Sequence, residues 1–130
     1  MTLYLDTSAL AKLLVVEAET PALRAYLRGR RDSRRVACGL VRAELRRVAV
    51  RLPGDLLPAA ERLLKGLVLV PVDDALLDTA GTLGPAVPRT LDAVHLAAAL
   101  RVAPVDALVT YDDRMADAAT GLGLQVVAPS

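Results

Sequence analysis

The sequence predicts an α/β fold, a three-layer α/β/α sandwich with a central, mostly parallel sheet. Segments that favour strands alternate with segments that favour helices along the whole chain. The strand segments are short, uninterrupted apolar runs, which is typical of parallel strands covered on both faces. The length of 130 residues suits one domain over 1–130 built around one core.

In the first part of the chain, residues 2–5 and 34–38 are the predicted strands. The clearest helix start is at Thr20, a predicted N-cap, followed by Pro21 at the first helical position. The apolar period and the Gly and Pro positions define the predicted helices, which cover 8–16, 21–29, 39–52 and 55–66.

The second part of the chain continues the alternation. The β-branched run LVLVPV predicts a buried strand, and Thr90 is the predicted cap of a helix that is apolar nearly all round. The predicted strands are 67–72, 106–111 and 124–127. The predicted helices are 73–83, 90–102 and 113–121, with a loop at 84–88.

The composition indicates in which cellular compartment the protein works. The chain is 54% hydrophobic, so we expect an exposed apolar patch that meets a partner. The longest apolar run, 93–100, is too short to cross a bilayer, and the first residues lack the features of a signal peptide. Cys38, the only cysteine, is expected to be buried at a strand end. These features predict a cytoplasmic protein without membrane contact.

Charge is unevenly distributed although the net charge is only +1. Arginines gather between Arg24 and Arg51, and they form either a solvated surface or a flank that binds phosphate. Phe and Trp are absent, so bases can stack only on Tyr4, Tyr26 or Tyr111.

Two acids follow predicted strands. Asp6 comes directly after the first strand and is either a helix N-cap or a ligand, since Thr7 or Ser8 can cap the helix equally well. Asp112 ends a later strand and is a better ligand candidate than Asp113. The carboxyl ends of parallel strands share one edge of the sheet, so we expect Asp6 and Asp112 to open onto the same edge.

Glu44 lies on or beside the apolar face of its helix, three residues after Val41 and four before Val48. A charge there is costly unless it is paired or coordinated. One interpretation is a site residue, and the other is an intrahelical ion pair with Arg47.

Asp92 is the only acid in the apolar helix and lies in its first turn. It either completes a cap that Thr90 begins or serves as a ligand. His95, one turn later, is either a ligand or a buried core residue, and a lone histidine in an apolar helix favours the core.

These carboxylates are expected to converge without a lysine, because Lys12 and Lys65 are the only lysines and neither follows a matching strand. Crowded carboxylates repel one another unless a cation joins them. A site made only of oxygen ligands favours Mg²⁺ or Mn²⁺ over zinc.

Four motifs, YLDTSAL, VRAEL, TLDAVHLAAAL and LVTYDDRM, together resemble the PIN-domain ribonucleases, above all the VapC toxins of type II toxin–antitoxin modules. The motifs stand in the family's order and cover the whole chain. The resemblance implies an Mg²⁺-dependent endoribonuclease with an RNA substrate, a homodimer and a VapB-like antitoxin. The catalytic and metal-binding residues that it implies are Asp6, Glu44, Asp92 and Asp112.

The same resemblance implies that Thr110 orients a water or a carboxylate and leaves Asp113 less certain. Metal-activated water would hydrolyse the phosphodiester bond, and Arg114 and the arginines from Arg28 to Arg47 are expected to contact the RNA backbone. One alternative is a receiver-like phosphoryl-transfer domain, but paired acids after the first strand and a late lysine are missing. Another is a non-catalytic PIN-like binding module.

Overall fold

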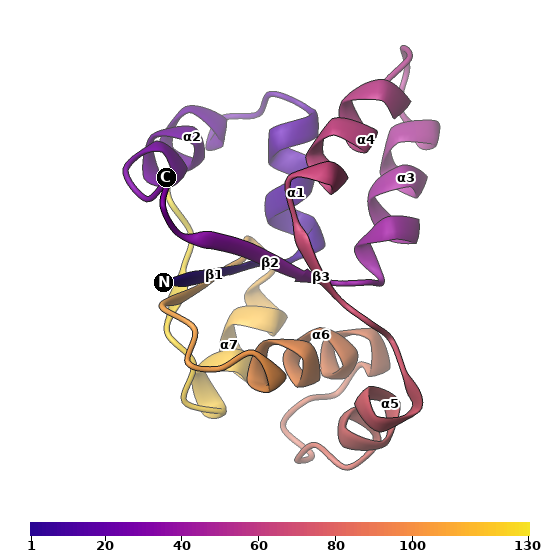
Figure 1. Cartoon of the computed structure of the whole chain (residues 1–130), viewed down its shortest axis with the longest axis vertical. Helices are drawn as coiled ribbons and strands as arrows, with labels where there is room; N and C mark the ends of the chain where they lie inside the picture. Colours follow the sequence, from indigo (N-terminus) through magenta and orange to yellow (C-terminus); the bar gives the residue numbers. More distant parts are fainter.

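The computed structural model describes residues 1–130 and has one five-stranded sheet between two layers of helices (Figure 1). Every strand pairing is parallel, and the strand order is β3-β2-β1-β4-β5. The predicted fold class is therefore confirmed. The strands are β1 (Thr2–Leu5), β2 (Arg34–Cys38), β3 (Val68–Val70), β4 (Ala107–Val109) and β5 (Val126–Val127).

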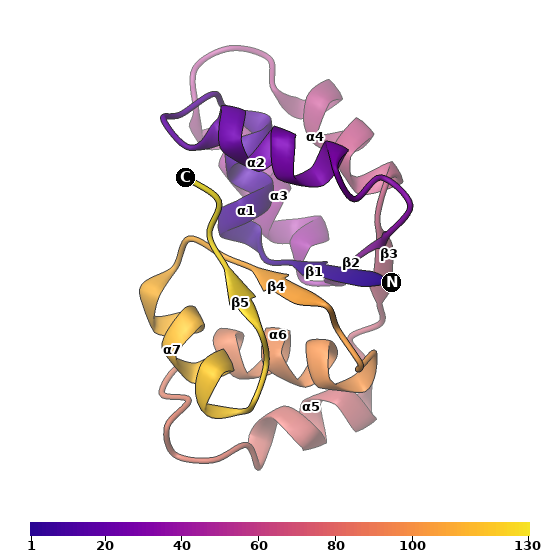
Figure 2. The same ribbon diagram turned by 90° about the vertical axis from the view of Figure 1, so that its left-hand side faces the viewer.

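Helices α1 to α4 cover one face of the sheet, and α5 to α7 cover the other (Figure 2). The first layer is α1 (Thr7–Leu14), α2 (Thr20–Arg28), α3 (Val41–Arg51) and α4 (Leu57–Lys65). The second layer is α5 (Asp74–Gly81), α6 (Thr90–Arg101) and α7 (Asp113–Gly121). None of these helices has the length and apolar character needed to cross a bilayer.

Side chains of β1 alternate between the two cores. Leu3 and Leu5 face the first helical layer, and Tyr4 faces the second. Because β1 is covered on both sides, all of its residues are buried, and its sequence after Thr2 is apolar. Cys38 is also fully buried at the end of β2, as predicted.

Helix α6 is buried along most of its length, with every residue from 92 to 99 shielded from solvent. It packs against both α5 and β2. Contact on several sides explains why its sequence has no polar face, and it brings Asp92 and His95 into the interior.

Three local predictions are wrong. Glu19, not Thr20, precedes α2 as its N-cap, and the Thr20 hydroxyl instead donates to the carbonyl of Lys12. Thr90 makes no cap, because α6 begins at Thr90 itself with Arg89 in the cap position. The run 67–72 is not a buried strand, because β3 is a short edge strand whose Val68 is 49% exposed.

The strand order creates a crevice between β1 and β4. From β1 the chain builds β2 and β3 to one side, whereas β4 and β5 lie on the other. In open parallel sheets, ligands bind at such a reversal, outside the carboxyl ends of the strands. Asp6 follows β1 and the segment from Thr110 to Asp112 follows β4, so both border this crevice.

Candidate active site

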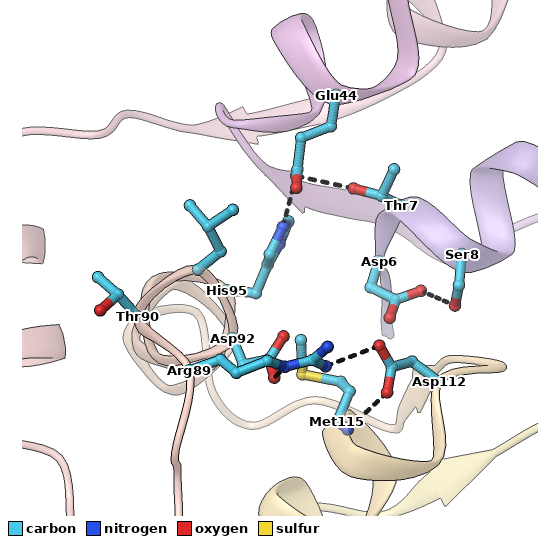
Figure 3. Close-up of a pocket in the computed structure, with 11 residues that line it drawn as sticks. Asp6, Thr7, Ser8, Glu44, Arg89, Thr90, Asp92, His95, Asp112 and Met115 are labelled. Carbon is cyan, nitrogen blue, oxygen red and sulfur yellow. Dashed lines mark hydrogen bonds and ion pairs between the residues drawn. The ribbon is translucent and has the colours of Figure 1, made fainter. Parts of the chain in front are cut away.

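A cavity of about 350 Å³ opens at the carboxyl edge of the sheet, meaning the edge where the strands end (Figure 3). We call it the acidic pocket. It brings together all four predicted acids, two of which come from helices α3 and α6 and two from the segments that follow β1 and β4. Its lining residues are Asp6, Thr7, Ser8, Glu44, Arg89, Thr90, Leu91, Asp92, His95, Asp112 and Met115.

Asp6 is held rigidly at the junction of β1 and α1. Its Oδ1 accepts hydrogen bonds from Ser8 Oγ at 2.6 Å and from the backbone N–H of Ala9 at 3.1 Å. The Thr110 hydroxyl, which follows β4, donates to Asp6 Oδ2. Asp6 is therefore the N-cap of α1, which confirms the capping interpretation, and Thr7 and Ser8 are not the cap.

Asp6 is only 3% exposed, and burial raises the pKa of its carboxyl above the ordinary value. The hydrogen bonds that it accepts oppose this shift only in part. Capping does not exclude a second role, because the side chain also lines the acidic pocket. Asp6 caps α1, and its position in the pocket is also compatible with a role as a metal ligand.

Glu44 is anchored by α6 and α1, not by its own helix. Its Oε1 lies 2.7 Å from His95 Nε2 and accepts a hydrogen bond of 2.8 Å from the Thr7 hydroxyl. No ion pair joins it to Arg47, so the intrahelical alternative is wrong. Burial alone would raise the pKa of Glu44, but the hydrogen bonds with His95 and Thr7 help to hold it below the usual value.

His95 is a buried and fully bonded residue, as the core interpretation predicted, and it also borders the pocket. The Cys38 N–H donates to the Tyr4 hydroxyl at 3.1 Å, and that hydroxyl lies 3.1 Å from His95 Nδ1. With Tyr4 donating to Nδ1, the imidazole carries its proton on Nε2 and donates to Glu44. The chain of hydrogen bonds fixes the orientation of the Glu44 carboxylate.

Arg89 joins the two remaining acids. Its Nε lies 2.6 Å from Asp92 Oδ2, and its Nη2 lies 2.8 Å from Asp112 Oδ2 (Figure 3). Asp112 is also the N-cap of α7, where its Oδ1 accepts the N–H groups of Arg114 and Met115. Burial would raise the pKa of Asp112, but the hydrogen bond and charge of Arg89 and the N–H groups of Met115 and Arg114 together hold this pKa below the usual value.

The expectation of carboxylates without a basic partner is wrong. No lysine lines the pocket, but Arg89 pairs with Asp92 and Asp112, and His95 bonds Glu44. A sequence signal existed for Arg89, because arginine three residues before Asp92 is in ion-pairing distance across one helical turn. The contact with Asp112 carries no such signal, since the two residues are 23 apart in the chain.

The pocket oxygens suit a hard divalent cation, because all four acids are carboxylates. No group of three or more His, Cys, Asp and Glu side chains is gathered closely enough to hold a metal ion directly. The reason is visible in the contacts: Arg89 separates Asp92 from Asp112, and Thr7 and His95 engage Glu44. The donor chemistry fits such a cation, and rotation of side chains is needed to assemble the ligands.

Other predicted site residues divide between the two edges of the sheet. Thr110 is buried against Asp6, whereas Asp113 and Arg114 are exposed at the start of α7. Arg28 lies with Met1 at the amino edge, where the strands begin, together with the rest of the 28–33 loop. That part of the arginine cluster is on the far side of the sheet from the acidic pocket.

Stacking on tyrosine, considered above, is restricted by the fold. Tyr4 is completely buried and cannot meet a base. The Arg30 guanidinium lies 3.8 Å from the centre of the Tyr26 ring, and Lys12 lies 4.9 Å from the centre of the Tyr111 ring. Both remaining rings are thus engaged by cations of the chain itself.

Comparison with known proteins gives a consistent result. The family model described as "PIN domain" matches residues 3–121. Over 98% of this chain and 98% of the relative, the chain is 49% identical to "Ribonuclease VapC46" of Mycobacterium tuberculosis (strain ATCC 25618 / H37Rv). It is 41% identical to "Ribonuclease VapC35" of M. tuberculosis strain CDC 1551 / Oshkosh and 40% identical to "Ribonuclease VapC47" of the same strain. Each of these two alignments covers 98% of this chain and 96% of the relative.

Proposed function

The chain belongs to the PIN domain family, and we propose that it is a metal-dependent endoribonuclease, the toxin of a toxin–antitoxin pair. Residues 1–130 would act as a single nuclease domain. The relatives named as VapC ribonucleases match nearly the whole chain, which supports an enzyme that hydrolyses RNA.

One observation supports this proposal most: four carboxylates from separate parts of the chain line one pocket at the reversal point of a parallel sheet. Burying or half-burying this many acids in one place is unfavourable unless positive charge compensates them. Arg89 supplies part of that charge by pairing with Asp92 and Asp112, and a bound divalent cation would supply the rest.

Asp6, Glu44, Asp92 and Asp112 are the residues that would hold Mg²⁺, with Mn²⁺ as a substitute. The bound ion would supply a nucleophilic water at neutral pH and positive charge for the phosphate. The lowered pKa values of Glu44 and Asp112 keep both side chains ionised at neutral pH.

The chain's own contribution is to fix these acids in place. Ser8 and Thr110 hold the two oxygens of Asp6, and Thr110 thereby ties the end of β4 to the end of β1. His95 and Thr7 hold one oxygen of Glu44, which leaves Oε2 free to face the pocket. Asp6 and Glu44 are thus oriented before an ion binds.

The proposal is tested by incubating the purified protein with RNA in Mg²⁺, in Mn²⁺ and in EDTA. We expect cleavage only with the cation, and products with 5′-phosphate and 3′-hydroxyl ends, because water attacks the phosphate. Cyclic 2′,3′-phosphate ends would show that the RNA's own 2′-hydroxyl attacks, and the proposed mechanism would be wrong. Absence of cleavage across many RNAs would favour the non-catalytic binding module.

The toxin role predicts a partner. Induction of this chain alone should arrest growth of a bacterial host, and co-expression of the small protein encoded beside it, a VapB-like antitoxin by expectation, should restore growth. An Asp6→Asn variant that still arrests growth would separate toxicity from RNA cleavage and contradict the proposal. We also expect a homodimer, which light scattering of the purified protein would measure.

The receiver-like alternative is weaker than the nuclease. Arg89 is the only Lys or Arg side chain among the lining residues, whereas that alternative calls for a lysine at a late strand end. The match to the PIN domain model over most of the chain also favours the nuclease.

A further inference from the structure

Arg89 occupies a position that the proposed function leaves without a role. Its guanidinium lies between Asp92 and Asp112 inside the acidic pocket, and its side chain remains 41% exposed (Figure 3). It stands just before α6, in extended backbone, so its side chain is not confined by neighbouring turns of the helix. It is therefore positioned to leave the two carboxylates without unfolding any element.

At Asp112, the oxygen that Arg89 uses is the one that a cation would need. Arg89 bonds Oδ2 of Asp92 and Oδ2 of Asp112. The other oxygen of Asp112, Oδ1, is already committed to two N–H groups at the start of α7. A cation that ligates Asp112 through Oδ2 must therefore take the place of the guanidinium.

A displaced Arg89 would be the only Lys or Arg side chain in the pocket available to an incoming phosphate. Its planar fork of N–H donors fits phosphate oxygens as well as it fits carboxylates. Arg114 lies close in sequence to Asp112 but is exposed at the start of α7 and does not line the cavity.

We propose that Arg89 is an RNA phosphate-binding residue that Asp92 and Asp112 hold in reserve until a divalent cation displaces it. This inference rests on the proposed function, because it takes both acids as cation ligands. Without the cation, Arg89 neutralises the two acids; with the cation bound, the guanidinium turns to the phosphate. The pocket would then bind RNA in position for cleavage only after the divalent cation has bound.

The first test measures Mn²⁺ binding without RNA, by titration with electron paramagnetic resonance detection of free Mn²⁺. Arg89→Gln removes the competing guanidinium, so it should bind Mn²⁺ about 5- to 10-fold more tightly than the wild type. Arg101→Gln is the matched control, because Arg101 ends the same helix and pairs with Asp73 outside the pocket. Its Mn²⁺ affinity should equal that of the wild type.

The Arg89→Lys variant distinguishes the effect of the positive charge from the effect of bridging two carboxylates. Lysine keeps the positive charge but lacks the fork that reaches two carboxylates at once, so this variant should also bind Mn²⁺ more tightly than the wild type, though less tightly than Arg89→Gln. Affinity equal to the wild type in Arg89→Lys would overturn the bridging role. A gain of affinity also distinguishes this role from structural damage, which would weaken binding.

The second test measures cleavage of a short RNA at saturating Mg²⁺. Arg89→Gln should raise KM by about tenfold, because a charged hydrogen-bond partner of the phosphate is lost, and Arg101→Gln should not. An unchanged KM, or unchanged Mn²⁺ affinity in Arg89→Gln, would overturn the inference while leaving the proposed function intact. If the wild type binds no Mn²⁺ at all, the proposed function fails and this inference fails with it.

Discussion

The two edges of the central sheet carry opposite charge and hold it in different ways. At the carboxyl edge, Asp6 and Glu44 are buried or half-buried and hydrogen-bonded to side chains from other elements. At the amino edge, the arginines of the 28–33 loop are exposed beside Met1, and none of them forms an ion pair. The fold fixes the orientation of a buried acid, whereas an exposed arginine side chain is mainly surrounded by solvent.

This comparison shows that charge density along the sequence is a poor guide to the candidate active site. The densest charged run, RGRRDSRR, leads to the amino edge. The acidic pocket is assembled from acids that are scattered through the chain and brought together by strand order. Topology, and not local composition, decides where the chemistry is.

The largest expected effect comes from removing one charge at the carboxyl edge. Asp6→Asn, Asp92→Asn or Asp112→Asn should each lower the RNA cleavage rate by about 10²–10³-fold, a loss typical of groups that stabilise charge in a transition state. Each variant should keep the far-UV circular dichroism of the wild type, since asparagine preserves the shape of the side chain.

Asp113→Asn is the matched control for Asp112→Asn. Asp113 is the next residue, but it is exposed and does not line the acidic pocket. It should cleave RNA at close to the wild-type rate. An inactive Asp113→Asn variant would mean that α7 contributes a second acid, and a fully active, folded Asp6→Asn variant would contradict the site as a whole.

A smaller effect is expected at Glu44, whose carboxylate is partly engaged by Thr7 and His95. Glu44→Gln should lower cleavage by about 10- to 100-fold, the range for groups that ligate or orient ligands of a metal site. Arg47→Ala, on the same helix but exposed and unpaired with Glu44, should retain most activity. Equal loss of stability in both variants would instead support an ion pair between Glu44 and Arg47.

The carboxyl edge also makes a prediction about stability in EDTA. The raised pKa of Asp6 means that the folded state retains a proton that the unfolded chain releases. Its destabilising effect should therefore grow as pH rises from the unfolded pKa of about 3.9 and level off above the folded pKa. For Asp112 the sign is opposite: its lowered pKa stabilises the fold above the unfolded pKa, and this is lost as pH falls through the folded pKa.

Thermal melts from pH 3 to pH 8 distinguish the two carboxylates. Relative to the wild type, the Tm of Asp6→Asn should rise with increasing pH and that of Asp112→Asn should fall, each by about 2–5 °C. Parallel curves for the two variants would show that the two acids have similar environments, against the contacts described above.

The strands and the edge at which the acids meet were largely predictable from the sequence. The apolar runs and Gly and Pro positions located the strands, and parallel strands that end in Asp6 and Asp112 must open onto one edge. The prediction of a buried strand failed at β3 because apolar character does not distinguish an edge strand from a central one. The contacts of Arg89 with Asp112 and of His95 with Glu44 were missed because they are set by the direction of side chains on packed elements, which periodicity does not encode.

The smallest effect is expected at the amino edge. The four residues of β1 span about 13 Å at the usual rise per residue, so the two edges are farther apart than the screening length of about 8 Å at physiological salt. Arg28, Arg30 and Arg31, changed together to Gln, should therefore alter kcat/KM on a short RNA by less than about twofold. Arg114→Gln, at the carboxyl edge, should raise KM by about threefold under the same conditions.

Salt concentration sharpens this last prediction. At an ionic strength of 0.01 M the screening length grows to about 30 Å, so the loop arginines should then begin to attract RNA from across the sheet. The triple variant should fall behind the wild type at low salt and recover at physiological salt, while Arg114→Gln should remain impaired in both. A tenfold loss in the triple variant at physiological salt would place the amino edge on the path of the RNA, and the division of labour between the two edges would be wrong.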